Sequence, residues 1–381
     1  MNIRSINIKT INNFIFILIN LKIIKKVLLI YRYYLNHPFW FYHSIIHTYN
    51  LTFYNYFCQN QILNKELCYI YNSGFIQDFN DKHSLNVSLK SNIPVTNYLV
   101  DFINKNYSNK LIKYKYTLDF FNNLNFNINY CISSNNNNKI YSIGFGRKIQ
   151  FTIDNIEYKS YYSDYLCVDS DYRRKGLFNS LFRYALSKSI DKDTKVFLFK
   201  RDFYPLPIKH FITYSYYELE DFSGDIKNTF ILKWTNNNIN LTRKLYDFYI
   251  TNLENKRVYN KFSFEEFIHY ISNPYNIFYY TISYSDKNNQ IEINGCVLIN
   301  KTHIYYGEKQ NTEIMFSIGY VEDILIKIYS TNNLVIFSSL NNNKSILSYK
   351  SIKYKKLSDC YYYLYNFNNR EIKEEEVFIQ F

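Results

Sequence analysis

Apolar and polar residues alternate over several stretches in the first half of the chain, which is the pattern of half-buried strands. One such stretch, 156–168, ends at the polar run 169–171, and from residue 176 the apolar residues follow helical spacing. The sequence therefore predicts a strand, a turn and a helix in succession. The strands predicted in this half are 129–133, 141–149, 156–168 and 196–199, and the helices are 94–106, 118–124 and 176–187. Residues 50–92 show no regular pattern.

The second half of the sequence also contains stretches with the alternation of strands and stretches with the spacing of helices. Ser263 and Glu266 have the spacing of a capping box, which predicts the start of a helix. The polar stretch 286–289 separates two apolar runs and predicts a hairpin. Strands and helices that alternate along the whole chain indicate the α/β (α+β) fold class. The helices predicted here are 241–249, 264–271 and 321–329, and the strands are 276–285, 290–300, 315–319, 335–340 and 361–366.

The first 36 residues are apolar but interrupted by polar side chains. The longest apolar run, 14–21, contains Asn20, and the lysines at 22, 25 and 26 follow it. No uncharged run reaches the roughly 20 residues that a membrane-spanning helix needs. The favoured interpretation is a basic amphipathic helix that contacts a membrane surface through residues 10–35 or packs on the body. An incidental extension and a signal peptide without a good cleavage site remain open.

Composition narrows the classes of partner. The 381 residues suffice for two domains or one two-lobed domain, and 45 Lys and Arg against 32 Asp and Glu give a net charge of +13. A basic surface suits phosphates or anionic membranes, whereas no zinc-finger or RNA-binding motif is present, so we expect no nucleic-acid partner. The six scattered cysteines indicate free thiols in a reducing compartment, and we therefore expect a cytoplasmic protein. The seven histidines have no metal-ligand spacing, so we expect no metal site.

The turn after the strand 156–168 carries the clearest chemistry. Arg173 and Lys175 flank it, and Gly176 allows the backbone to approach a ligand closely. Free N–H groups and the dipole at the start of a helix attract phosphate, so the turn predicts an anion site. An ordinary turn with solvated basic residues is the alternative at this point.

The order Arg-x-x-Gly at 173–176 resembles the acyl-CoA pyrophosphate loop of the Gcn5-related acetyltransferase superfamily. The string Tyr-Leu-Cys-Val at 165–168, followed by Arg173-x-Lys175-x-Leu177, resembles a motif of protein N-myristoyltransferases, which are two-lobed relatives of the acetyltransferases. The Phe-Trp pair at 39–40 and the Tyr-rich string 361–366 also resemble that family.

This resemblance implies two acetyltransferase-like lobes with pseudo-two-fold symmetry around a mostly antiparallel mixed sheet. The corresponding division is an N-terminal extension (1–36), an acyl-CoA-binding lobe (37–233) and a peptide-binding lobe (234–381). It also implies a monomer that transfers a myristoyl group from myristoyl-CoA to the N-terminal glycine amine of proteins, without a cofactor. A short-chain N-acetyltransferase and a catalytically impaired acyl-CoA-binding relic remain open as alternatives.

The resemblance also assigns roles to individual residues. The backbone N–H groups of Tyr165 and Leu166 would stabilise the oxyanion, and the terminal carboxylate of Phe381 would be the general base. The acyl-CoA would contact a further set of residues: Phe39, Trp40, Val168, Arg173, Arg174, Lys175, Gly176, Leu177 and Phe178.

Three departures from the family pattern affect the predicted site. Asp164 stands where the family has an Asn before the oxyanion pair, and Phe199 stands in place of a Thr. The loop 108–115 contains Lys110, Lys113 and Lys115 where the family has acidic residues. We therefore expect this loop to disfavour basic peptides.

Overall fold

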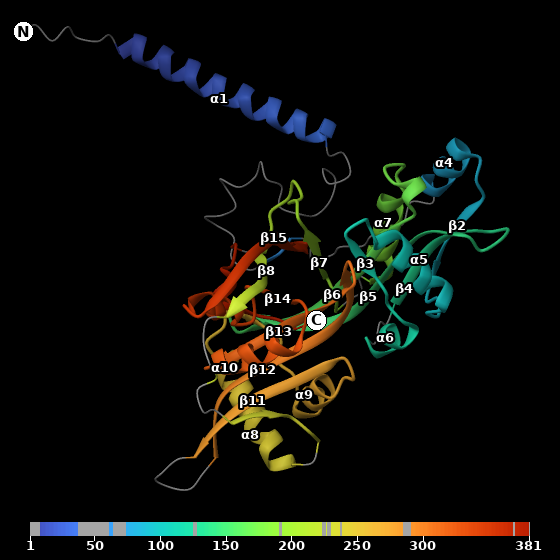
Figure 1. Cartoon of the computed structure of the whole chain (residues 1–381). Coiled ribbons are helices and arrows are strands. Elements are labelled where there is room, and N and C mark those ends of the chain that lie inside the picture. The colour runs from blue at the N-terminus through green and yellow to red at the C-terminus, as the bar shows by residue number, and fades with distance from the viewer. Residues whose placement is uncertain are drawn as a thin grey trace, which may run out of the picture.

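A mixed sheet of 15 strands forms the body of the protein (Figure 1). The computed structural model describes residues 8–36, 61–63, 74–124, 128–189, 193–222, 226, 230–236, 238–284, 291–368 and 370–380. The elements at the centre of the first half are β4 (Ile128–Ser134), β5 (Ile140–Ile153), β6 (Ile156–Val168), α7 (Leu177–Ser189), β7 (Val196–Asp202) and β8 (Ile212–Phe222). Those of the second half are β11 (Asn276–Tyr284), β12 (Ile291–Tyr306), β13 (Lys309–Gly319), α10 (Glu322–Thr331), β14 (Val335–Ser338) and β15 (Ile352–Tyr365).

The two halves repeat one unit. In the first, β5 and β6 are antiparallel, and α7 then leads to β7, which is parallel to β6. In the second, β12 and β13 are antiparallel, and α10 leads to β14, which is parallel to β13. The central strand order β5-β6-β7-β15-β8-β14-β13-β12 places the equivalent strands symmetrically about its midpoint. The predicted two-lobed α/β fold with a mostly antiparallel sheet is therefore confirmed.

The halves also exchange strands at the centre of the sheet. β15 pairs with both β7 and β8, although it comes from the second half of the sequence. β8 in turn pairs with β14. The sheet is thus continuous across the lobe boundary predicted at residue 233. Residues from both halves meet where β7 of the first unit pairs with β15. That boundary remains a prediction.

The other strands of this sheet are β2 (Val87–Ser91), β3 (Ile112–Tyr114), β9 (Phe230–Lys233), β10 (Val258–Tyr259) and β17 (Val377–Phe378). The helices beside it include α4 (Gly74–His83), α5 (Asn97–Tyr107), α6 (Leu118–Asn123), α8 (Ile239–Leu253) and α9 (Phe264–Ile271). Short pieces complete the set: β1 (Gln61–Ile62), β16 (Phe367–Asn368) and the 3₁₀ turns η2 (Ser170–Tyr172), η3 (Asn343–Ser348) and η4 (Glu374–Glu376).

The equivalent helices α7 and α10 are each held to the sheet by an apolar face. Leu181 and Ala185 of α7 are fully buried, and so are Ile324 and Ile328 of α10. Their spacings of four residues place each pair on one side of its helix, as the sequence pattern predicted. The buried core is rich in aromatic side chains, and Tyr161, one of the largest, is 0% exposed. Packing of this kind fixes the ends of β6 and α7, between which the predicted anion turn lies.

The structure corrects several predicted boundaries. The helix predicted from Pro94 begins at Asn97, because the Thr96 side chain caps it by accepting the Leu99 N–H. The region 50–92, for which no structure was predicted, contains α4 and β2 in its described part. The strands predicted at 156–168 and the capping box of Ser263 and Glu266 are confirmed.

A long N-terminal helix, α1 (Ile8–Asn36), projects from the body (Figure 1). Its Tyr33 is only 8% exposed and belongs to an aromatic cluster with Phe182 of α7 and Phe199 of β7. Most of its other apolar side chains are exposed, including Phe16 at 67% and Leu28 at 60%. Among the described helices, none combines the length and apolar character needed to cross a membrane.

Candidate active site

Strand β6 contains a β-bulge at Tyr165 and Leu166. Phe145 of β5 pairs with Asp164, whereas Ile143, two residues earlier, pairs with Cys167, three residues later. The strand β6 therefore carries one extra residue there, and Tyr165 adopts a φ of 51°. Tyr165 and Leu166 thus fall between the paired positions Asp164 and Cys167.

The pairing of β6 with its other neighbour, β7, ends just before the bulge. β6 and β7 pair only from Ser160 to Ser163, and β7 then continues beside β15. Tyr165 and Leu166 therefore lie where the register with β5 is interrupted and the pairing with β7 has ended. Backbone N–H groups in such a position can stabilise a developing negative charge on oxygen. The structure thus brings the two predicted oxyanion donors to the place where the sheet opens.

Packing holds the bulge in one conformation. The Tyr107 hydroxyl donates a hydrogen bond to the Leu166 carbonyl at 2.9 Å. A Cβ atom at Gly144 would lie only 2.7 Å from Leu166 Cδ2, so β5 needs a glycine where it passes the bulge. The Tyr165 ring packs edge-to-face on Phe121, with ring centroids 5.0 Å apart. These contacts come from α5, α6 and β5, which explains why the bulge could not be predicted from the local sequence.

The Asp164 side chain accepts a hydrogen bond from one of the two predicted oxyanion donors, the Tyr165 N–H. The Tyr165 N–H donates to Asp164 Oδ1 at 2.8 Å, and the Tyr162 hydroxyl lies 3.4 Å from Oδ2. Burial raises the pKa of the Asp164 carboxyl above its ordinary value, and this outweighs the opposing effects of Lys200 and Arg147. An ionised Asp164 would compete with a substrate oxygen for the Tyr165 N–H.

The turn between β6 and α7 contains two residues with a left-handed backbone. Arg174 has a φ of 63° and Gly176 a φ of 97°, and a Cβ atom at Gly176 would meet nothing within 4 Å. The space beside Gly176 is thus open to a ligand. The first N–H groups of α7 have no acceptor inside the helix, which makes this end of the helix suitable for an anion.

The side chains of the turn divide into two groups. Arg173 points back to the protein, because its Nε lies 3.2 Å from the Val168 carbonyl and its Nη2 lies 2.5 Å from the Asn106 carbonyl. The Asn106 side chain in turn accepts the Ser170 N–H at 3.0 Å. Arg173 therefore tethers the turn to the end of α5. Its predicted contact with a pyrophosphate must come in addition to these bonds.

Arg174 and Lys175 remain exposed beside the helix end. Lys175 Nζ lies 4.7 Å from the centroid of the Tyr172 ring, a cation–π contact that holds the ammonium near the turn. In the second half, the equivalent helix α10 has Glu322 and Asp323 in its first turn. These carboxylates would repel an anion, so the repeated fold offers an anion site only in the first half.

The other predicted contact residues lie in different surroundings. Leu177 is buried, and Val168 packs against the same apolar cluster. Phe178 is 38% exposed and stacks on Phe182, with centroids 5.8 Å apart. The predicted residues Phe39, Trp40 and Phe381 lie outside the described residues, and their roles remain predictions.

The last described residues of the chain are held deep in the second half. The Asn260 side chain bonds both the N–H and the carbonyl of Gln380, at 2.6 and 2.8 Å. The Tyr270 hydroxyl donates to Gln380 Oε1 at 2.6 Å, and Asn341 Oδ1 accepts the Ile379 N–H at 2.8 Å. Gln380 is only 3% exposed. The backbone is therefore buried and fixed through residue 380.

Ionisable side chains of both halves gather beside the bulge. Lys200 Nζ of β7 lies 3.5 Å from Asp202 Oδ1, and the Tyr216 hydroxyl donates to Glu313 Oε1 at 3.1 Å. Burial raises the pKa of Glu313, and the charge of Lys200 opposes that shift. The charge of Lys200 acts on Asp164 in the same way. Sequence reasoning missed Lys200 and Glu313, because neither stands in a recognisable motif and they come from strands far apart in the sequence.

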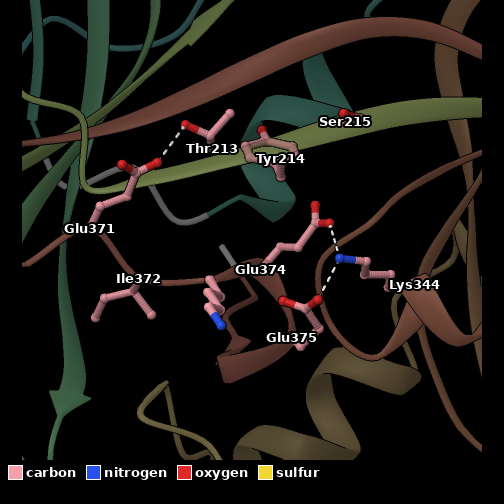
Figure 2. A pocket seen from close by; sticks show the side chains of 9 residues that line it. Thr213, Tyr214, Ser215, Lys344, Glu371, Ile372, Glu374 and Glu375 are labelled. Atoms are coloured by element: carbon pink, nitrogen blue, oxygen red, sulfur yellow. Dashed lines mark hydrogen bonds and ion pairs between the residues drawn. The ribbon is translucent and has the colours of Figure 1, made fainter.

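A separate pocket of about 610 Å³ lies beside β8 and the segment 371–375 (Figure 2). Its Lys344 pairs with Glu374 at 2.7 Å and also contacts Glu375, while Thr213 bonds Glu371 at 3.3 Å. None of the predicted site residues lines this pocket. In the part of the chain that the structure describes, no group of three or more His, Cys, Asp or Glu side chains could hold a metal ion.

Comparisons with known proteins place this geometry in a known fold. No protein-family model matches the sequence, and no curated protein matches it. A crystal structure of Saccharomyces cerevisiae N-myristoyltransferase with bound myristoyl-CoA matches with a TM-score of 0.66 at 12% identity, covering 88% of this chain and 94% of that one. A second structure of that protein with myristoyl-CoA gives a TM-score of 0.67 at 12% identity, covering 92% and 95%. The chain therefore has the N-myristoyltransferase fold.

Proposed function

We propose that this protein is a divergent N-myristoyltransferase that transfers a myristoyl group from myristoyl-CoA to an N-terminal glycine amine. One observation carries the proposal: the bulge at Tyr165 and Leu166 leads directly into the open turn at Gly176, within a fold whose solved relatives bind myristoyl-CoA. A donor pair for a thioester oxygen and an anion site for a pyrophosphate thus lie at the two ends of one short segment.

The reaction follows from these parts. The pyrophosphate of the acyl-CoA would lie against the first N–H groups of α7, with Arg174 and Lys175 beside it. The thioester carbon would then lie at the bulge, where the glycine amine attacks it and the charge on its oxygen develops. The N–H groups of Tyr165 and Leu166 would stabilise that charge, and the sulfur would leave as the CoA thiolate. The amine must lose a proton, which requires a base nearby.

The buried chain end supports the terminal carboxylate as this base. Asn260 and Asn341 fix the backbone of residues 379 and 380, so only Phe381 separates these fixed bonds from the carboxylate. Tyr270, which bonds Gln380, also lies within electrostatic range of Arg147 and Glu313. Gln380 is therefore bonded to a side chain that lies near charged groups of both halves. Asn260 and Asn341 are positioning residues in this proposal.

A catalytically impaired acyl-CoA-binding protein is the second candidate, and Asp164 is the observation that favours it. Its carboxylate already accepts the Tyr165 N–H, leaving a substrate oxygen to displace it. Both candidate functions require the protein to bind a long-chain acyl-CoA, and calorimetric titration with myristoyl-CoA and acetyl-CoA tests this. We expect myristoyl-CoA to bind more tightly, and equal affinities would contradict a site built for a long acyl chain.

The substitution Asp164→Asn should increase acyl transfer at neutral pH. An amide oxygen is a weaker acceptor than a carboxylate, and the Tyr165 N–H would become available at a saving of about 1 kcal/mol, or about 5-fold in rate. The pKa of Asp164 is raised, so the wild-type carboxyl loses its negative charge as the pH falls through that raised value. The difference between the variant and the wild type should therefore shrink at acidic pH. Single-turnover rates across pH measure this.

Asp164→Glu is the matched control, because it keeps the charge and should not reproduce the increase. A lower rate for Asp164→Asn at every pH would show that the carboxylate serves the reaction directly, for instance by holding or deprotonating the acceptor amine.

We also expect a preference for peptides with acidic or neutral residues after the glycine. The three lysines of the loop 108–115 are exposed, and Lys115 Nζ lies 4.3 Å from the centroid of the Tyr305 ring on β12. β3 pairs with β12, which places these lysines where the first half of the chain joins the second. Like charges would repel a basic peptide. Scoring a glycine-initiated peptide library for acylation tests this, and a clear preference for lysine would contradict it.

A further inference from the structure

We propose that α1 binds to the headgroup region of a membrane that contains anionic phospholipids. This inference does not rest on the proposed acyl transfer. The helix has 29 residues, and its apolar side chains are exposed along most of its length. Surface patches of this kind are costly in water and mark a site that another apolar phase covers. The exposure of the following residues lies between 43% and 67%: Phe16, Ile17, Leu18, Ile19, Leu21, Ile23, Ile24, Val27, Leu28, Leu29, Tyr31 and Leu35.

The charges of α1 indicate that the apolar phase covering it is a membrane with anionic lipids. Lys22, Lys25 and Lys26 have spacings of three and four residues, and Arg32 follows Lys25 by seven, so these cations share one side of the helix with Leu18 and Leu29. The sequence of α1 contains no Asp or Glu. A cationic side with no acidic counterpart matches the phosphates of anionic lipids, and each such residue near the surface adds to the affinity. The long lysine side chains can reach the headgroups while their stems stay in the apolar layer.

The helix should lie along the membrane rather than across it. Three lysines within the apolar stretch would each cost about 2.5–3.5 kcal/mol at the centre of a bilayer. In the interface the same residues contribute favourably, and the opposite side of the helix is apolar. Tyr33, near the end of α1, is buried in a cluster with Phe182 and Phe199, so a bound helix would hold the first half of the protein at the membrane surface.

A second copy of the chain covers this surface less well than a lipid layer does. Residues 17, 21, 24, 28, 31 and 35 are apolar and follow alternating spacings of four and three, as in the seam of a coiled coil. A paired helix covers that seam only. Ile19, Ile23 and Val27 lie outside it and would stay exposed at 51%, 54% and 57%. Lipid chains can cover both sets of residues at once.

Vesicle flotation of the full-length protein tests this inference. We expect binding to vesicles of phosphatidylcholine mixed with an equal part of phosphatidylserine, and weaker binding to phosphatidylcholine alone. The double variant Ile24→Asp/Leu28→Asp should lower the affinity at least about 100-fold, because two apolar side chains leave the interface. The triple variant Lys22→Ser/Lys25→Ser/Lys26→Ser should lower the affinity for the anionic vesicles about 100-fold and change binding to neutral vesicles little.

The matched control is Ile156→Asp/Ile239→Asp, which alters two residues of similar exposure, 54% and 61%, outside α1. It should bind vesicles as the wild type does. All variants should unfold at the wild-type temperature, because the altered residues are exposed. Absence of wild-type binding to the anionic vesicles would overturn the inference, as would unchanged binding by Ile24→Asp/Leu28→Asp. A lipid-free dimer that the same variant dissociates would assign α1 to a second copy instead.

Discussion

Removal of Phe381 should lower the rate of acyl transfer by about 10²–10⁴-fold, which is the usual effect of losing a general base. The carboxylate would move back by one residue, about 3.3 Å along a strand, and out of hydrogen-bond reach of the amine. Appending residues to the C-terminus should have a comparable effect, because the buried chain end would then carry an uncharged amide. Single-turnover acylation with an N-terminally tagged protein measures both changes.

Phe381→Leu is the matched control, since it keeps the carboxylate where it is and should retain most of the activity. Acyl-CoA affinity should survive in all three proteins, because the turn at Gly176 belongs to the other half of the fold. Equal rates for the wild type and the deletion would exclude the terminal carboxylate and make Asp164 the next candidate for the base.

The second large effect should come from the basic turn. The double variant Arg174→Glu/Lys175→Glu should weaken acyl-CoA binding at least about 100-fold, because each lost charge-assisted hydrogen bond costs about 1.5–3 kcal/mol. Both side chains are exposed beside the N-terminus of α7, so the change should leave the fold intact. Arg173 is a poorer target, because its guanidinium bonds the carbonyls of Val168 and Asn106, and its loss would disturb the turn itself.

Lys159→Glu/Lys355→Glu provides a control with the same change of net charge at exposed positions on β6 and β15, away from the turn. Its affinity for acyl-CoA should match that of the wild type in a calorimetric titration. If both double variants bind equally well, the turn does not hold the pyrophosphate. If both weaken equally, the effect is one of overall charge.

The sequence predicted those parts of the fold that local chemistry determines. β6, the capping box at Ser263 and the start of α7 after Gly176 each depend on residues within a few positions of one another. The resemblance of 165–168 and 173–177 to a known motif then supplied the overall arrangement. The repeated unit and the mostly antiparallel sheet follow that expectation.

The parts that sequence reasoning missed depend on distant contacts. The influence of Lys200 on Glu313 exists only because β7 and β13 belong to one continuous sheet. The bonds of Asn260 and Asn341 to the chain end join residues far apart in the sequence, and neither residue stands in a motif. Arg173 was assigned to the ligand alone, whereas its bonds to backbone carbonyls appear only once α5 and β6 are packed together.

The most direct test of the proposed function is mass spectrometry of a glycine-initiated peptide incubated with the protein and an equal mixture of acetyl-, octanoyl- and myristoyl-CoA. The proposal predicts that the peptide gains a myristoyl group on its N-terminal amine, and that an otherwise identical peptide beginning with alanine gains none. Transfer of the acetyl group in preference to the myristoyl group would identify a short-chain acetyltransferase. Tight binding of myristoyl-CoA with no acylated peptide at all would contradict catalysis and leave a protein that only binds acyl-CoA.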